Sequence, residues 1–218
     1  MLEVNIRQTF PDDFGVTENV TREAFWNVYG PGCDEHYLLH IMRGSADFIP
    51  ELDLVAVHDG EIIGNIVCDR SVIKTDNGST VAVLTLGPIA VLPEFQGQGA
   101  GGLLIEEAKR LARNLGFEAI LLYGDPKYYS RLGFIPGETL DIRTANDMYA
   151  EPLQVIELSK GALTGKSGRY FENDIYDLEE QAATEFDKQF PPKEKIEGLP
   201  SQQRFQELLK ARRPRKLN

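Results

Sequence analysis

The sequence predicts a mixed α+β fold with a mostly antiparallel sheet flanked by helices. Two hairpin signals support the antiparallel part. Asp59-Gly60 separates the apolar runs 52–58 and 61–68, and the turn at 76–79 precedes the long apolar run 80–91. Runs of this kind, joined by short turns, are typical of antiparallel strands.

A third observation predicts one parallel strand pair. Leu104, Ala108 and Leu111 recur at helical spacing within 100–115, and a continuous apolar run follows at 118–123. A strand, a helix and a second buried strand form a right-handed crossover. Within the strand before this helix, Gly87-Pro88 predicts a deformed region, because proline has no N–H for a regular ladder.

Composition limits the functional classes. The chain has 218 residues, is 42% hydrophobic and carries a formal net charge of −11. The acidic balance argues against a non-specific nucleic-acid binder, and it favours weakly a cationic substrate. The cysteines Cys33 and Cys68 have no metal-type spacing. We find no signal-peptide profile and no apolar run of roughly 20 residues, so we expect a cytoplasmic protein that does not cross a membrane.

The N-terminal part predicts a strand over 2–7, a helix over 11–26 and a second helix that Asp34 caps. On the second helix, His36 and His40 are four residues apart, close enough to share a metal ion. The alternative is that both histidines flank a packed apolar stripe. Because no third ligand is evident, we expect packing and no metal.

The C-terminal part predicts a short helix over 127–132, a strand that begins at 134–136 and a last strand of the main sheet over 153–158. Residues 160–218 then change character. We therefore expect a catalytic or binding domain over 1–159 and an appendage over 160–218.

The appendage is expected to be partly helical, with helices over 177–190 and 201–213. It ends in a basic cluster over 210–216, which is usually a solvated feature. We expect the appendage to pack on the core or on a partner chain, so a homodimer is possible.

The stretch from Leu86 to Leu104 predicts an anion site. It combines a strand, a connector, a glycine-rich turn and the start of a helix. Free backbone N–H groups and the positive end of the helix dipole converge at such a turn. A P-loop is excluded because no lysine follows Gly101-Gly102. A dinucleotide fold is disfavoured because residues 93–96 separate the strand from the glycines.

Two motifs give this chain a resemblance to a known family. Val91-x-Pro-x-x-Gln96-x-x-Gly99-x-Gly101 resembles the pyrophosphate motif of the GNAT acetyltransferase superfamily, and Tyr129-Ser-Arg-Leu-Gly133-Phe134 resembles its Tyr-x-x-x-Gly-Phe segment. The element order over residues 3–158 is also similar. The resemblance implies a GNAT-like mixed sheet with a splayed central strand pair.

The resemblance also implies a set of site residues. The pyrophosphate of acetyl-CoA would be bound by the turn, which comprises Gln96, Gly97, Gln98, Gly99, Ala100, Gly101 and Gly102. The preceding strand would pair with the pantetheine arm and direct an amide at the thioester carbonyl. Its residues are Ile89, Ala90 and Val91. Tyr129 would protonate the departing thiolate, since a phenol pKa lies just above that of a thiol.

The implied activity is acetyl transfer from acetyl-CoA to a primary amine in a ternary complex. The base stays open, with Glu51, Asp69 and Asp125 as carboxylates near predicted strand ends. The chain departs from many members by having Leu122-Tyr-Gly-Asp125 where they carry an asparagine. A non-catalytic acyl-CoA-binding module is the alternative. The acceptor site would be shaped by residues 28–34, the helix after them and the appendage.

Overall fold

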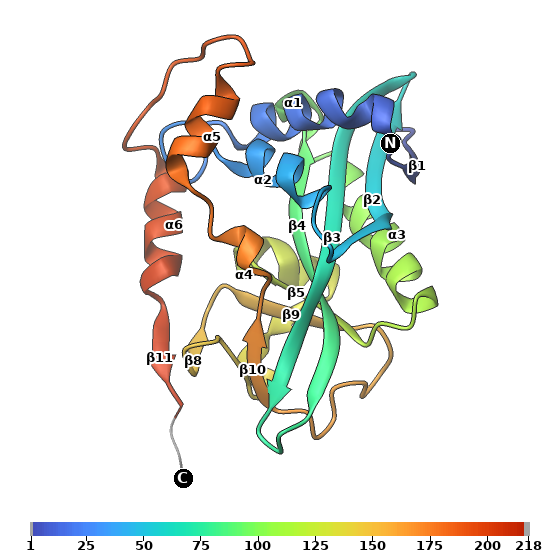
Figure 1. Ribbon diagram of the computed structural model, residues 1–218, viewed down its shortest axis with the longest axis vertical. Coiled ribbons are helices and arrows are strands. Elements are labelled where there is room, and N and C mark those ends of the chain that lie inside the picture. Colours follow the sequence, from blue (N-terminus) through green and yellow to red (C-terminus); the bar gives the residue numbers. More distant parts are fainter. Residues whose placement is uncertain (1, 216–218) are drawn as a thin grey trace. The chain divides into compact units, whose positions relative to one another are not determined.

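The computed structural model describes residues 2–215, which form two compact units (Figure 1). Unit 1 comprises residues 2–69, 87–108 and 174–203. Unit 2 comprises residues 70–86, 109–173 and 204–215. Strands β3 and β4 and helices α3 and α6 contribute residues to both.

The strands of the described chain are short except for three consecutive long ones, β2, β3 and β4, in the first half of the sequence. They are β1 (Asn5–Gln8), β2 (Phe48–His58), β3 (Glu61–Thr75), β4 (Thr80–Val91), β5 (Ala119–Tyr123), β6 (Ile135–Pro136), β7 (Ile142–Arg143), β8 (Met148–Ala150), β9 (Leu153–Glu157), β10 (Gly168–Phe171) and β11 (Arg212–Pro214).

The helices include α-helices and single 3-10 turns. The α-helices are α1 (Phe14–Phe25), α2 (Glu35–Met42), α3 (Ala100–Asn114), α4 (Pro126–Tyr129), α5 (Glu180–Asp187) and α6 (Pro200–Lys210). The 3-10 turns are η1 (Pro11–Asp13), η2 (Pro93–Phe95), η3 (Ser130–Leu132), η4 (Gly137–Leu140) and η5 (Asp174–Tyr176).

The sheet of unit 1 is antiparallel, as the hairpin signals predicted. β1 pairs with β2, and β2 pairs with β3 through the Asp59-Gly60 turn, where both residues have positive φ. Gly64 on β3 permits a close approach of β4 and α3. A Cβ at that position would lie 2.7 Å from Ala90 O and 3.4 Å from Leu104 Cδ1. The absence of a side chain therefore brings the glycine turn and its helix against the sheet.

A buried charged network links the helices of unit 1. Arg22 on α1 is 1% exposed, and its Nε donates to Asp187 Oδ1 on α5 at 2.6 Å. The His36 ring on α2 lies 3.1 Å from the same oxygen. The Arg22 guanidinium also stacks on Trp26, with Cζ 4.2 Å from the ring centroid. In Figure 1, α1 and α5 lie next to α2, which agrees with these contacts.

The sheet of unit 2 contains the predicted parallel pair. β4 pairs in parallel with β5 at Leu84–Ile120 and Thr85–Leu121, and β5 pairs antiparallel with β9. β6 pairs with β9, and buried residues such as Val83, Leu121 and Val155 fill the core. The expected mostly antiparallel sheet with a parallel crossover is thus confirmed.

The prediction that 153–158 is the last strand of the main sheet was wrong. β10, which lies in the predicted appendage, pairs antiparallel with β3 and in parallel with β7. Its Tyr170 is buried, and the Tyr170 hydroxyl lies 2.6 Å from Thr85 Oγ1. Strand β11 pairs antiparallel with β8 in a separate two-stranded sheet.

The appendage contributes to both units, because residues 174–203 belong to unit 1 and the remainder belongs to unit 2. The domain boundary after residue 159 stays a prediction. Within the expected basic cluster, Arg213 pairs with Glu138, and Arg215 pairs with Asp76 and Asp141. Lys216 lies outside the described residues. Of the helices described, none has the length and apolar character that crossing a membrane requires.

Candidate functional site

The glycine-rich turn leaves open space beside its backbone. Gly97 has φ +74° and Gly99 has φ +98°, a region that side chains rarely adopt. At either position a Cβ would have no neighbouring atom within 4 Å. The turn is therefore a backbone surface that a ligand can approach closely.

Helix α3 begins within this turn, at Ala100. The first helical hydrogen bond runs from Leu103 N–H to Gly99 O at 3.1 Å. The N–H groups of Ala100, Gly101 and Gly102 come before that bond and so have no carbonyl of the preceding turn as helical partner. N–H groups of this kind and the positive end of the helix dipole favour an anion, so the anion site at this turn stays a prediction that the local geometry allows.

Two glutamine side chains hold the turn in shape. Gln96 Nε2 donates to Val91 O at 2.9 Å, and Gln98 Nε2 donates to Glu94 O at 2.9 Å. Gln96 thereby links the turn back to the last residue of β4. Gln96, the first residue of the family motif, therefore stabilises the turn through its side chain.

The end of β4 adjoins this turn. Ala90 is buried, whereas Ile89 and Val91 are half-buried. Leu92 N–H donates to Ile63 O at 2.9 Å, so the residue that follows β4 is still hydrogen-bonded to β3. The expected deformation lies at Gly87, which has φ +143°, and the Gly87-Pro88 peptide is cis.

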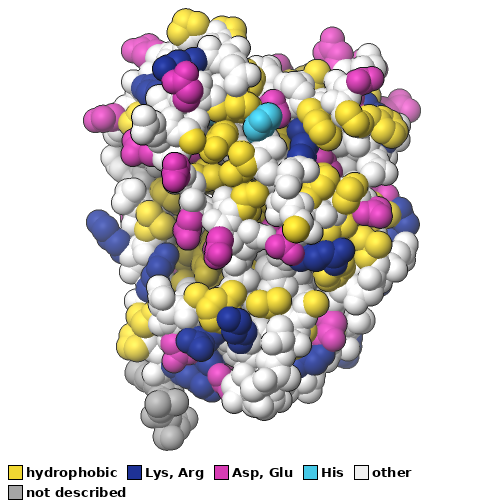
Figure 2. Space-filling view, viewed as in Figure 1, with side chains coloured by type: hydrophobic (Ala, Val, Ile, Leu, Met, Phe, Trp, Pro, Cys, Tyr) yellow, Lys and Arg dark blue, Asp and Glu magenta, His cyan; other side chains and the backbone are white. Residues whose placement is uncertain are grey.

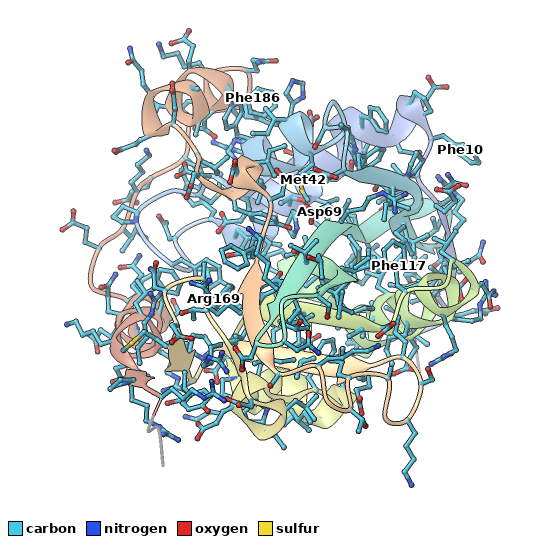
Figure 3. All side chains as sticks on the ribbon, turned by 60° about the horizontal axis from the view of Figure 1, so that its bottom comes forward. Phe10, Met42, Asp69, Phe117, Arg169 and Phe186 are labelled. Carbon is cyan, nitrogen blue, oxygen red and sulfur yellow. The ribbon has the colours of Figure 1, made fainter. Side chains whose placement is uncertain are left out.

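Tyr176 in η5 contacts this deformed region, a contact that the sequence analysis did not predict. Its hydroxyl donates to Asp69 Oδ1 at 2.8 Å and lies 3.2 Å from Gly87 O, a second acceptor. Asp69, labelled in Figure 3, is 1% exposed. The hint available in the sequence was the apolar run Ile175-Tyr176 with Leu178, which packs against the cluster around Leu38 and Met42.

The other two candidate bases have different surroundings. Glu51 is exposed on β2. Asp125 caps α4 through Lys127 N–H, and Arg204 donates to both of its oxygens at 2.9 and 3.2 Å. The hydrogen bond from Arg204 is the main reason why the pKa of Asp125 lies below its ordinary value. Asp125 is therefore a cap and an ion-pair partner, and a poor proton acceptor.

Tyr129 lies at the end of α4 in unit 2. Its ring packs edge-on against Tyr128, with centroids 4.9 Å apart, and against Phe134, with centroids 5.6 Å apart. Gly124 makes room for this ring, because a Cβ there would lie 2.2 Å from Tyr129 Cε2. Gly124 lies in the segment where many family members carry an asparagine. Because it has no side chain, the Tyr129 ring can pack against the backbone there.

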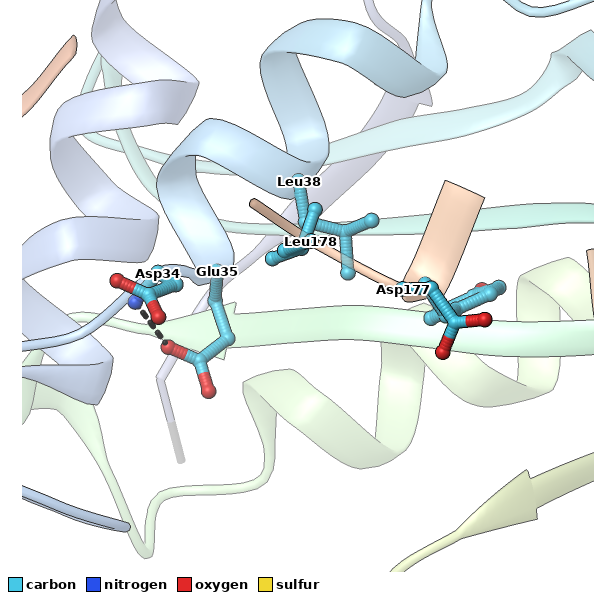
Figure 4. Close-up of a pocket in the computed structure, with 6 residues that line it drawn as sticks. Asp34, Glu35, Leu38, Asp177 and Leu178 are labelled. Carbon is cyan, nitrogen blue, oxygen red and sulfur yellow. Dashed lines mark hydrogen bonds between the residues drawn. The ribbon is translucent and has the colours of Figure 1, made fainter. Parts of the chain in front are cut away.

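A pocket of about 590 Å³ lies in unit 1 and is formed by three segments that were expected to shape the acceptor site: the end of 28–34, the helix after it and the appendage. It is lined by Asp34, Glu35, Leu38, Tyr176, Asp177 and Leu178 (Figure 4). Burial raises the pKa of Glu35 to about 7, although the N–H groups of Glu35 and Asp34 oppose that rise. The pKa of Asp34 is also raised, mainly by burial.

The histidine pair on α2 does not share a ligand. His36 Nε2 lies 3.1 Å from Asp187, and burial lowers the pKa of His36 to about 4. His40 Nδ1 lies 2.9 Å from Glu18 Oε1. Over residues 2–215, no three His, Cys, Asp or Glu side chains are grouped as metal ligands.

Comparison with known families and proteins agrees with this geometry. The family model described as "Acetyltransferase (GNAT) domain" matches residues 51–136. The uncharacterized N-acetyltransferase YhbS of Escherichia coli K12 is 30% identical over 135 residues, which are 62% of this chain and 78% of YhbS. The uncharacterized N-acetyltransferase YjhQ of the same strain is 37% identical over 87 residues, 40% of this chain. The chain spans about half the length of YjhQ, 48%.

Two solved structures share the fold. The E. coli YhbS structure in complex with CoA has a TM-score of 0.72 at 26% identity, over 82% of this chain and 94% of that one. A GNAT family acetyltransferase from Brucella melitensis, in complex with acetyl-CoA, has a TM-score of 0.64 at 27% identity, over 81% of this chain and 100% of that one. The chain therefore belongs to the GNAT family of N-acetyltransferases, and its mixed α+β fold is the fold of that family.

Proposed function

We propose that this protein transfers the acetyl group of acetyl-CoA to a primary amine. The observation that carries the proposal is the open glycine turn at the start of α3, with Gly97 and Gly99 at positive φ and free space beside them. Relatives with similar chains are N-acetyltransferases, and two similar structures contain CoA or acetyl-CoA.

The turn fits a pyrophosphate. Backbone amides from Gln98 to Gly102 would donate to phosphate oxygens, and the helix dipole would favour their negative charge. Gln96 and Gln98 would act indirectly, since their side chains already hold the turn through Val91 O and Glu94 O. The backbone of Ile89, Ala90 and Val91 would bind the pantetheine arm.

The chemistry requires one bond to form and one to break. The amine nitrogen attacks the acetyl carbon, the carbon–sulfur bond breaks, and the proton that the amine loses passes to solvent water. A backbone amide of Ile89–Val91 would stabilise the carbonyl oxygen as it gains charge. We propose that Tyr129 supplies a proton to the leaving sulfur, and its half-buried ring, wedged between Tyr128 and Phe134, supports a fixed orientation.

Two measurements on the full chain test this proposal. Saturating acetyl-CoA should raise the Tm, because a ligand that binds only the folded state stabilises it. Free CoA should then appear when a panel of primary amines is added. A raised Tm without CoA release would favour a non-catalytic acyl-CoA-binding module. No Tm shift would contradict acetyl-CoA binding altogether.

A further inference from the structure

The pocket of unit 1 has two acidic ends and an apolar middle. Figure 4 shows Asp34 and Glu35 at one end and Asp177 at the other, with Leu38 and Leu178 between them. Its volume of about 590 Å³ is in the range that holds small molecules. An apolar wall bounded by carboxylates at both ends matches an alkyl chain with a positive charge at each end.

Tyr176 connects this pocket to the proposed acetyl-CoA strand within the same unit. Its side chain lines the pocket, and its hydroxyl lies 3.2 Å from Gly87 O on β4. Two residues further along the strand is Ile89, where the proposed pantetheine-binding backbone begins. A molecule in the pocket would therefore share a wall with that strand.

Charge in the pocket is poorly compensated. Glu35 accepts a hydrogen bond from Asp34 N–H at 3.1 Å, and the Asp34 carboxylate disfavours ionisation of Glu35. The cation that acts on Asp34 is Lys195, whereas Glu180 and Asp187 add negative charge around it. Because the net balance is acidic, a bound cation would relieve repulsion among these groups and lower the pKa of Glu35 toward its ordinary value.

From these contacts we propose that the pocket is the acceptor site, and that it selects amines with a second cationic group on a short alkyl chain. This inference rests on the proposed N-acetyltransferase function and names its substrate class. Asp34 and Glu35 would bind the amine at one end and Asp177 the amine at the other, while Leu38 and Leu178 contact the methylene groups. The amine that reacts first loses a proton to solvent water, and the other stays an ammonium group.

The test compares three acceptors with the same four-carbon chain: diaminobutane with terminal amines, butylamine and aminobutanol with terminal groups. With acetyl-CoA fixed, CoA release should give diaminobutane a kcat/KM at least about tenfold above those of the other two, as expected for one charge-assisted hydrogen bond. Glu35→Gln and Asp177→Asn should each remove most of that preference and leave the KM for acetyl-CoA unchanged. Glu61→Gln, at an exposed position outside the pocket, is the matched control.

The outcomes separate this inference from the proposed function. Equal turnover of all three amines, or an unchanged preference in both pocket variants, would overturn the inference and leave the acetyltransferase proposal standing. If no amine releases CoA, the acetyltransferase proposal fails. Calorimetric titration of diaminobutane then decides whether the pocket is a cation site: binding that Glu35→Gln weakens supports it, and no binding refutes it.

Discussion

At the residue scale, Glu35 gives the clearest pH signature. Burial raises its pKa from 4.5 to about 7, so the folded chain binds the proton more tightly than the unfolded chain. Between these two values the folded state holds more protons, and the free energy of unfolding therefore falls as pH rises. The loss of stability that comes from ionising the buried Glu35 is fully present above about pH 7 and absent below pH 4.5.

This penalty predicts the behaviour of Glu35→Gln. The variant should lose less stability than the wild-type chain between pH 4.5 and about pH 7, by up to about 3 kcal/mol, since one pKa unit corresponds to about 1.4 kcal/mol. Denaturant unfolding at several pH values measures the difference. Glu61→Gln should keep the wild-type slope. Parallel curves for Glu35→Gln and the wild type would show that Glu35 carries no such penalty.

Tyr129 is the second residue with a specific expectation. Replacing Tyr129 with phenylalanine removes the proton that we assign to the leaving sulfur but keeps the ring between Tyr128 and Phe134. The kcat should fall by about 10²–10⁴-fold, the usual contribution of general acid catalysis, while acetyl-CoA affinity stays nearly constant. Tyr128→Phe is the matched control, at a neighbouring ring that is 41% exposed. An unaltered kcat for Tyr129→Phe would remove Tyr129 from the mechanism.

At the element scale, Arg22 holds α1, α2 and α5 of unit 1 together. It is 1% exposed and pairs with Asp187, which also lies beside His36. Removing one partner of a buried pair leaves an uncompensated charge. The start of α2 and residues 176–178 line the pocket, so this network also supports the proposed acceptor site.

Arg22→Ala should therefore destabilise the chain by about 3–5 kcal/mol. Arg7→Ala removes an ion pair of similar geometry, 2.6 Å from Asp13, at a side chain that is 33% exposed. That change should cost less than about 1 kcal/mol, because water screens the pair. Chemical denaturation compares the two variants. Equal losses would mean that burial does not determine the strength of these pairs.

At the whole-molecule scale, local features were predictable from sequence. The turns at Asp59-Gly60 and at Gly97 and Gly99 could be predicted because they depend on local backbone preferences. Each of these residues has a positive φ, which glycine and aspartate adopt more readily than most residues. The parallel pair β4–β5 followed from the helix between the two strands. The family motifs predicted a GNAT-like fold, and the comparison with YhbS confirmed that fold.

Features made by distant segments were not predictable. The pocket exists because residues 176–178 pack against the start of α2. The sequence indicated that this helix and the appendage would shape the acceptor site, but no local pattern identified these residues of the appendage. Likewise β10 joins β3 through backbone pairing that any short strand can make. The homodimer, the cytoplasmic location and the domain boundary after residue 159 stay predictions.

On the face in Figure 2, Lys and Arg side chains lie among Asp and Glu and form no continuous basic surface.

The central claim is that the glycine turn before α3 binds acetyl-CoA. Gly99→Ala places a methyl group in the open space and forces alanine to φ +98°. Gly78→Ala is matched, with φ +88° and equally open space in a different turn. Both changes should cost similar stability, about 1–2 kcal/mol.

Calorimetric titration of acetyl-CoA onto the full chain tests this claim most directly. The Gly99→Ala variant should bind at least about tenfold more weakly than the wild type, a loss of about 1.4 kcal/mol. The Gly78→Ala variant should bind with the wild-type Kd. Equal affinity for all three proteins would contradict the assignment of this turn as the acetyl-CoA site.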